Sequence, residues 1–241
     1  MRIIRVKDYE KMSQMAADVI TVQILLKPDS VLGLATGSSP EGIYGRLVTK
    51  YKQGELDFSQ VTTVNLDEYR GLSGKNPQSY RYYMSEHLFN HVNIRPEAIH
   101  LPDGMEEDVE KAVQEYEEAI ASVGRTDLQL LGLGANGHIG FNEPNQVFEK
   151  GVHCVNLEES TIEANSRFFE SPDEVPRQAI TMGIQNIMQA KRILLVVSGK
   201  GKAKAVRDTV LGPITPQVPG SILQLHQDVV LIGDEEALSL L

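Results

Sequence analysis

The stretch DLQLLGLGANGHIGFNEPN, residues 127–145, decides the fold, because it joins a short apolar run to a glycine-rich loop. Residues 127–131 have the length and composition of a buried strand. The three glycines that follow let the backbone turn sharply. The segment therefore predicts a strand whose carboxyl end presents polar side chains, among them His138 and Glu143.

The glycines of this loop also fit the G-x-G-x-x-G fingerprint of dinucleotide-binding proteins. Such a loop needs a helix directly after it, to aim backbone N–H groups at a pyrophosphate. Here Gly140 and Pro144 fall inside the required helix, so we reject the nucleotide interpretation. What remains is a loop carrying Asn136, His138 and Glu143, residue types suited to proton transfer near neutral pH. A histidine with a purely structural role is the alternative.

Apolar runs alternate with helical patterns along the whole chain, which predicts an α/β fold. Continuously apolar strands are typical of a parallel sheet covered on both faces. We therefore expect a single domain over residues 1–241, with a mostly parallel, doubly wound sheet in a three-layer, modified Rossmann-like arrangement. Ligands in such sheets bind beyond the carboxyl ends of the strands. The predicted strands are 31–35, 61–66, 128–134, 192–199 and 229–233, and the predicted helices 12–20, 40–51, 78–90, 106–123 and 202–211.

The composition excludes several classes of protein. Formal net charge is −10 without a basic stripe, which argues against binding to nucleic acid or to a membrane surface. The one cysteine, Cys154, suits a reducing compartment. Charges near the start occupy the place where a signal peptide needs an apolar run, and no apolar stretch reaches membrane-spanning length. We expect a cytoplasmic protein.

Two further strand ends carry candidate binding or catalytic groups. The loop ATGSSPEG (35–42) opens a helix and offers free N–H groups to a phosphate, although an ordinary capped turn explains it equally well. Asp67 follows the strand 61–66, where it is either a general base or a residue that caps a turn.

The stretch SGKGKAKAV (198–206) places lysines at a predicted helix start. Lysines there oppose the helix dipole, which favours a bound anion, with solvated lysines as the alternative. No metal site is predicted, because His87 and His91 lie at helical spacing without a third ligand.

The motifs together resemble the glucosamine-6-phosphate deaminase family (glucosamine/galactosamine-6-phosphate isomerases). The combination of LDEY, GHIGFNEP and NSRFF is specific to it, and the resemblance covers the chain from about residue 30 to the end. The segments that carry it are ATGSSPEG, VNLDEYRGL, SYRYYM, LGLGANGHIGFNEP, TIEANSRFF, AITMGI, SGKGKA and SILQLH.

The resemblance implies conversion of D-glucosamine 6-phosphate and water to D-fructose 6-phosphate and ammonia, without a metal or organic cofactor. It implies that His138 opens the sugar ring, with Glu143 and Asn136 orienting it, and that Asp67 moves the C2 proton. It also implies a mobile lid at about 145–185. The phosphate would lie on Thr36, Gly37, Ser38, Ser39, Arg167 and Lys202.

The chain departs from the family in two places. Many members have Asp where this chain has Asn136, and an amide orients His138 without adding negative charge. Allosteric members carry basic residues after NEP, where this chain has His153 and Val155. This argues against activation by N-acetylglucosamine 6-phosphate and against a hexamer, so we expect a monomer or a small homo-oligomer.

Two alternatives share the expected fold. A 6-phosphogluconolactonase would hydrolyse an ester and release no ammonia. A sugar-phosphate-sensing regulator would bind without turnover, but such regulators usually carry a helix-turn-helix segment before this fold. An assay for ammonia and fructose 6-phosphate separates all three.

Overall fold

The computed structural model describes residues 1–166, 169, 171 and 174–241. Within this part of the chain a seven-stranded sheet has the order β1-β10-β9-β6-β2-β3-β5, and every neighbouring pair is parallel. The predicted parallel α/β fold is therefore confirmed. The strands are β1 (Arg2–Val6), β2 (Val31–Leu34), β3 (Thr62–Asn65), β5 (Ile99–His100), β6 (Leu128–Leu131), β9 (Arg192–Val197) and β10 (Val229–Asp234).

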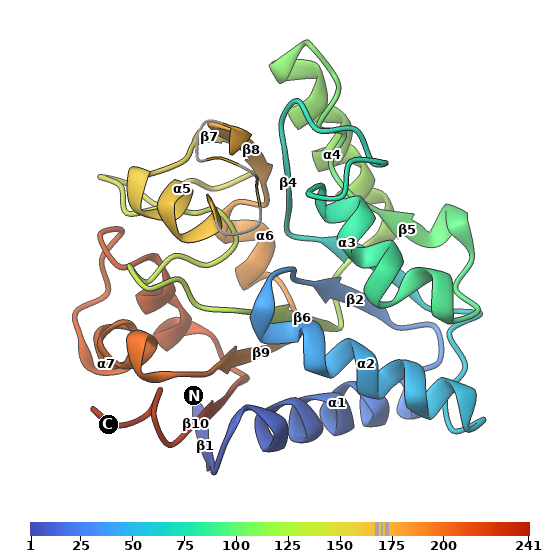
Figure 1. Cartoon of the computed structure of the whole chain (residues 1–241), viewed down its shortest axis with the longest axis horizontal. Helices are drawn as coiled ribbons and strands as arrows, with labels where there is room; N and C mark the ends of the chain where they lie inside the picture. Colours follow the sequence, from blue (N-terminus) through green and yellow to red (C-terminus); the bar gives the residue numbers. More distant parts are fainter. Residues whose placement is uncertain (167–168, 170, 172–173) are drawn as a thin grey trace.

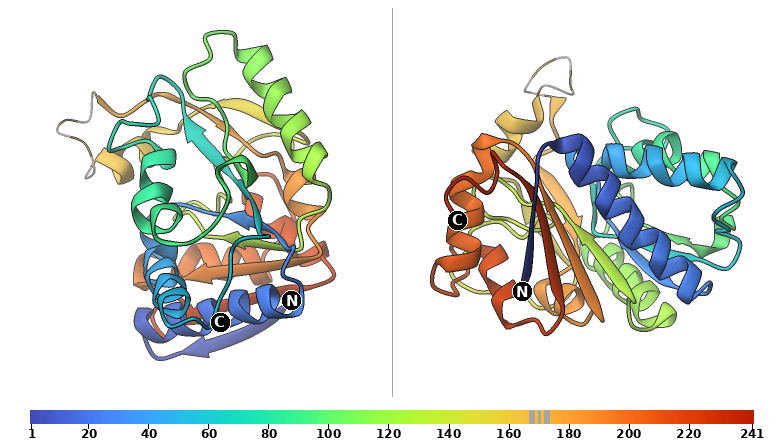
Figure 2. Two further views of the ribbon diagram at one scale, coloured as in Figure 1. Left: turned by 90° about the vertical axis from the view of Figure 1, so that its right-hand side faces the viewer. Right: turned by 90° about the horizontal axis from the view of Figure 1, so that it is seen from below.

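Helices cover both faces of this sheet, as expected for a three-layer fold. In the view from below, α1 and α2 lie on one side of the sheet and α7 on the other (Figure 2). The α-helices are α1 (Tyr9–Leu26), α2 (Ser38–Lys52), α3 (Tyr80–His87), α4 (Val109–Val123), α5 (Glu159–Ser166), α6 (Ile184–Met188) and α7 (Ala203–Leu211). Short 3-10 turns include Phe89–His91, Pro96–Ala98, Lys200–Lys202 and Pro219–Leu225. None of the described helices is long and apolar enough to cross a membrane.

Side-chain caps set where the helices begin. The helix predicted from residue 106 starts at Val109, because the Asp108 carboxylate accepts hydrogen bonds from two N–H groups of the first turn. The helix predicted over 78–90 starts at Tyr80, because the Ser79 hydroxyl accepts from the Tyr82 N–H group. It ends at His87, and a 3-10 turn over Phe89–His91 completes the predicted range.

A second, antiparallel sheet lies beyond the carboxyl ends of the large one (Figure 1). Its order is β4-β8-β7, with β4 at Asp67–Tyr69, β7 at His153–Asn156 and β8 at Gln178–Thr181. It packs on an apolar cluster separate from the main core, formed by Tyr69, Phe141, Leu157, Ile162, Val175 and Ala179. We call β4, β7, β8 and α5 the small-sheet unit.

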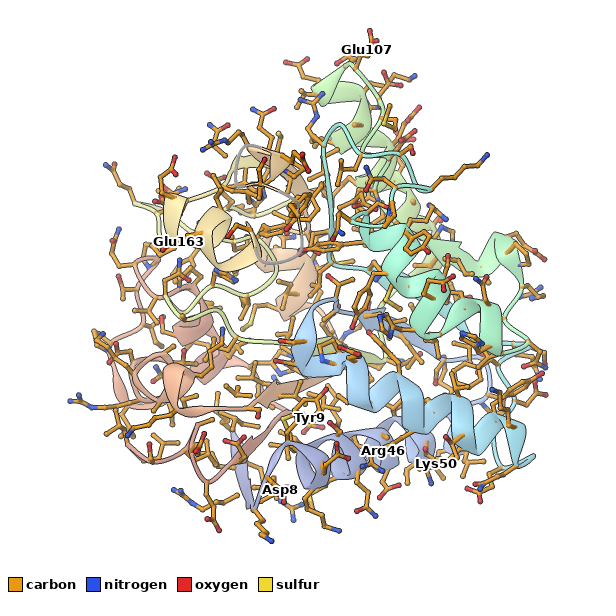
Figure 3. All side chains as sticks on the ribbon, viewed as in Figure 1. Asp8, Tyr9, Arg46, Lys50, Glu107 and Glu163 are labelled. Atoms are coloured by element: carbon orange, nitrogen blue, oxygen red, sulfur yellow. The ribbon has the colours of Figure 1, made fainter. Side chains whose placement is uncertain are left out.

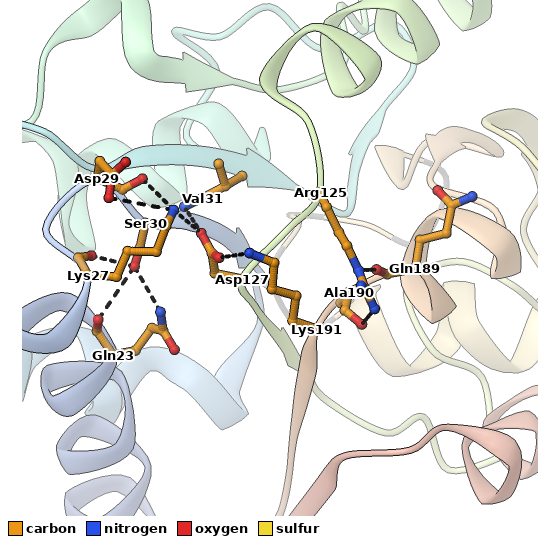
Figure 4. A network of polar contacts seen from close by, with 10 residues as sticks. All are labelled: Gln23, Lys27, Asp29, Ser30, Val31, Arg125, Asp127, Gln189, Ala190 and Lys191. Carbon is orange, nitrogen blue, oxygen red and sulfur yellow. Dashed lines mark hydrogen bonds and ion pairs between the residues drawn. The ribbon is translucent and has the colours of Figure 1, made fainter.

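Asp127 links three segments at the amino ends of the strands of the large sheet, away from the small sheet (Figure 4). The carboxylate is 3% exposed and accepts hydrogen bonds from Lys27 at 2.7 Å, Lys191 at 2.8 Å and the Val31 N–H group at 2.9 Å. Burial alone would raise the pKa of Asp127, but the two lysines and the N–H group hold it below its ordinary value. The network therefore connects the end of α1 with the starts of β2 and β9.

Replacing Asp127 by alanine is expected to lower the free energy of unfolding by about 2 kcal/mol. The Val31 N–H group loses its acceptor, whereas both lysines can turn to water, which keeps the loss moderate. Urea unfolding followed by circular dichroism measures the change. The control is Asp29→Ala, since Asp29 is 71% exposed and only 3.6 Å from Lys27. Equal effects from both variants would contradict the prediction.

Candidate active site

The loop after β6 holds His138 in place through glycines. The imidazole packs so closely over Gly134 that a Cβ atom there would lie 2.5 Å from the ring. Gly137 and Gly140 have φ angles of +88° and +59°, in the left-handed region that favours glycine. The His138 N–H group donates to Asn136 Oδ1 at 3.1 Å. The glycine spacing of the sequence motif thus serves tight packing around an imidazole.

Glu143 is the centre of the polar contacts in this loop. Its Oε2 atom accepts a hydrogen bond from Asn136 Nδ2 at 2.8 Å and lies 3.3 Å from His138 Nδ1. Its Oε1 atom accepts from the Thr161 hydroxyl at 2.5 Å. Burial raises the pKa of Glu143, but His138 and the two hydrogen-bond donors outweigh it and lower the pKa below its ordinary value. The structure therefore keeps an ionised carboxylate against the imidazole.

Asp67 lies beside the same loop, although it belongs to another sheet. It opens β4, where it pairs with Thr181 of β8. The Thr181 hydroxyl accepts a hydrogen bond from the Phe141 N–H group at 3.1 Å. A Cβ atom on Gly140 would lie 3.6 Å from Asp67 Oδ2. The β4–β8 ladder thus brings the carboxyl group of Asp67 to the turn between His138 and Glu143.

The neighbouring carboxylates Asp67 and Glu68 differ in their environments. Glu68 accepts hydrogen bonds from the N–H groups of Tyr69, Tyr80 and Arg81 at 2.8–2.9 Å, which explains its burial. Asp67 accepts no hydrogen bond from any residue that the structure describes and is 6% exposed. Burial, with a smaller contribution from the Glu68 charge, raises the pKa of Asp67 from 3.8 to about 8. Such a carboxyl group exchanges protons near neutral pH.

The phosphate candidates lie at the start of α2. Gly37 has a φ angle of +93° and turns the chain into the helix at Ser38, while Thr36 lies half-buried between β2 and Gly37. Tyr9, labelled in Figure 3, is the first residue of α1. It braces the start of α2, because its hydroxyl group donates to the Ser38 carbonyl at 2.9 Å and accepts from the Gly42 N–H group at 2.8 Å. The start of a helix that is held this way suits an anion.

Lys202 lines a cavity of about 760 Å³ together with Ser38, Ser39 and Ser198. Asp234 shapes its loop, because the carboxylate accepts hydrogen bonds from the Ser198 hydroxyl and the Gly199 N–H group. The structure thus brings Lys202 to the α2 start. Asp67 and His138 do not line this cavity, and Arg167 lies outside the described residues.

Sequence reasoning missed three residues of the site: Tyr9, Thr161 and Thr181. Each acts through a hydroxyl group contributed by a segment remote from the one it contacts; Thr161 is 18 residues from Glu143. Thr161 opens the segment TIEANSRFF, but no local pattern indicated a partner for it. Only the fold reveals such contacts.

A buried carboxyl group beside a histidine–carboxylate pair, at the carboxyl edge of a parallel sheet, defines an enzyme that moves protons. The family described as glucosamine-6-phosphate isomerases/6-phosphogluconolactonase matches residues 8–232. The chain belongs to this family.

Relatives match over the full length. The chain is 55% identical over 241 residues to the glucosamine-6-phosphate deaminase of Halothermothrix orenii, covering 100% of both chains. It is 56% identical over 239 residues to that of Clostridioides difficile, covering 99% of this chain and 96% of the relative. A solved monomeric glucosamine-6-phosphate deaminase superposes with a TM-score of 0.97 at 48% identity, covering 100% of both chains. A 6-phosphogluconolactonase from Thermotoga maritima shares the fold, with a TM-score of 0.75 at 19% identity and 97% and 99% coverage.

Proposed function

We propose that the chain converts D-glucosamine 6-phosphate and water to D-fructose 6-phosphate and ammonia, an aldose–ketose isomerisation coupled to deamination in amino-sugar catabolism. Full-length identity of about 55% to relatives named glucosamine-6-phosphate deaminase carries this proposal. The proximity of Asp67 to the His138 loop supports it, since isomerisation needs a base near the group that opens the ring. The likeness to lactonases is a likeness of fold alone.

The resemblance to the family implies the proposed roles, and the contacts within the loop are consistent with them. His138 moves the proton between O1 and O5 to open the ring, with Glu143 and Asn136 setting its orientation. Asp67 takes the proton from C2 and returns it to C1 through an enolamine. Water then adds to the imine carbon, and ammonia leaves as the ketone forms.

The phosphate group is proposed to bind at the start of α2. Its oxygens would accept hydrogen bonds from this loop and from Lys202, which lines the same cavity as Ser38 and Ser39. The loop residues are Thr36, Gly37, Ser38 and Ser39, and Arg167 would add a second cation.

The pH dependence of kcat/KM tests the role of Asp67. A base must be deprotonated to work, and burial keeps this carboxyl group protonated up to a pKa of about 8. We therefore expect kcat/KM to fall about tenfold per pH unit as the pH drops below 8. Initial rates between pH 5.5 and 9, in buffers of constant ionic strength, give the profile. A flat profile between pH 6 and 8 would assign the base to another group.

The assay for the function measures two products. Purified protein is incubated with glucosamine 6-phosphate, and ammonia and fructose 6-phosphate are determined separately. Equal amounts of both support the proposal. Turnover of 6-phosphogluconolactone without ammonia release would indicate the lactonase instead, and binding of the sugar phosphate without turnover would indicate a sensor.

We also propose a lid at about 145–185, of which residues 167–168, 170 and 172–173 lie outside the part of the chain that the structure describes. We further propose that the protein works in the cytoplasm, as a monomer or small homo-oligomer of one domain, without cofactors or activation by N-acetylglucosamine 6-phosphate. A cavity of about 290 Å³ behind Glu143 supports the last point. Its described lining includes the carboxylates Glu149 and Glu158 besides Glu143, with His153 but no lysine or arginine. Such a lining disfavours a second phosphate.

A further inference from the structure

The two oxygens of Glu143 face different parts of the molecule. Oε2 serves the loop, through Asn136 and His138, whereas Oε1 accepts the hydroxyl of Thr161 from the first half of α5. Glu143 is 7% exposed and Thr161 is 4% exposed, so bulk water has little access to this contact. Thr161 Oγ1 is therefore the donor on which the buried Oε1 atom depends.

We propose that Thr161 is a positioning residue for the His138–Glu143 pair, an inference that rests on the proposed function. A carboxyl group rotates about its Cγ–Cδ bond, and rotation moves Oε2 away from the imidazole. The hydroxyl on Oε1 fixes that rotation and offsets the cost of burying the charge. Thr161 touches neither sugar nor phosphate in this scheme; it acts through Glu143.

The backbone around Thr161 is itself anchored. Its N–H group donates to the Glu158 carbonyl at 2.9 Å, and the next residue, Ile162, belongs to the apolar cluster of the small-sheet unit. Phe141 of the histidine loop belongs to the same cluster. The hydroxyl is thus delivered from a packed element, which is what precise positioning requires.

The same unit also carries the proposed base. Asp67 opens β4, which pairs with β8, and α5 connects β7 to β8. The small-sheet unit therefore contributes the proposed base, Asp67, and also holds the Glu143 carboxylate through Thr161. The contact between Thr161 and Glu143 fixes the position of Glu143 relative to Asp67.

Two substitutions at one position test the proposal. Thr161→Val keeps the shape and loses the donor, whereas Thr161→Ser keeps the donor. We expect Thr161→Val to lower kcat about tenfold or more with KM changed less than about threefold, and Thr161→Ser to stay within about threefold of wild type. Thr21→Val is the matched control, because Thr21 is a buried helical threonine whose hydroxyl bonds the Ala17 carbonyl. It should leave kcat unchanged.

Crystal structures of both variants measure the position directly. In Thr161→Val the His138 Nδ1–Glu143 Oε2 distance should exceed hydrogen-bonding range, and in Thr161→Ser it should not. This readout holds even if the wild type releases no ammonia, an outcome that would remove the proposed function and not the positioning. Wild-type kcat in Thr161→Val, equal losses in both variants, or an unmoved Glu143 would overturn the inference. Thr161→Ala replaces the valine variant if that one does not fold.

Discussion

Asp67→Asn is expected to lower kcat by about 10²–10⁴-fold, because an amide cannot accept the C2 proton. The side chain keeps its shape, so affinity for glucosamine 6-phosphate should remain largely intact. Steady-state assays of ammonia release give kcat, and isothermal titration with the inactive variant gives the dissociation constant. The control is Asp29→Asn, because Asp29 is exposed and lies at the amino ends of the strands of the large sheet. Near-normal turnover in Asp67→Asn would remove Asp67 from the role of base.

The same variant has a signature in stability. The folded protein holds the proton on Asp67 up to a pKa of about 8, whereas the unfolded chain releases it near 3.8. Between these values the folded state binds more protons, so this group's contribution to the free energy of unfolding falls as the pH rises. Asp67→Asn lacks that dependence. Urea unfolding at pH 5, 6.5 and 8 measures the effect. The free energy of unfolding of the variant, relative to that of the wild type, should rise with pH over this range.

Lys202→Ala is expected to raise KM between about tenfold and 100-fold, with a smaller loss in kcat. In the proposed assignment the Lys202 ammonium group binds the phosphate, which takes no part in the chemistry, so its loss should weaken binding in the ground and transition states alike. Lys204→Ala is the control, since Lys204 lies two residues further along in α7, pairs with Asp208 and has a side chain that is 80% exposed. Unchanged substrate affinity in Lys202→Ala would disprove the phosphate assignment.

The large sheet could be predicted because several of its strands are short apolar runs followed by helical patterns, as in VLGL and RILLVV. The edge strand β1 and the two-residue β5 were missed, since two arginines interrupt the apolar residues of RIIRV and Ile99–His100 is too short to form a pattern. The small sheet was missed for a similar reason. Its strand β4 spans three residues, Asp67–Tyr69, and depends on pairing with β8, more than 100 residues away.

The site divides in the same way. Asn136, His138 and Glu143 could be grouped from the sequence because they lie within eight residues, and the structure brings them into contact. The position of Asp67 beside them followed only from the rule that strand ends meet at one edge. Thr161 could not be predicted, because a hydroxyl group becomes informative only when its acceptor is known.

The mounting of the imidazole and the base on separate sheets has an evolutionary consequence. His138 lies on a loop of the large sheet, which the main core supports. Asp67 is held instead by the pairing of β4 with β8 in the small-sheet unit, which has an apolar cluster of its own. Sequence changes in the small-sheet unit can therefore shift the carboxyl group of Asp67 relative to the His138 imidazole while the large sheet stays folded.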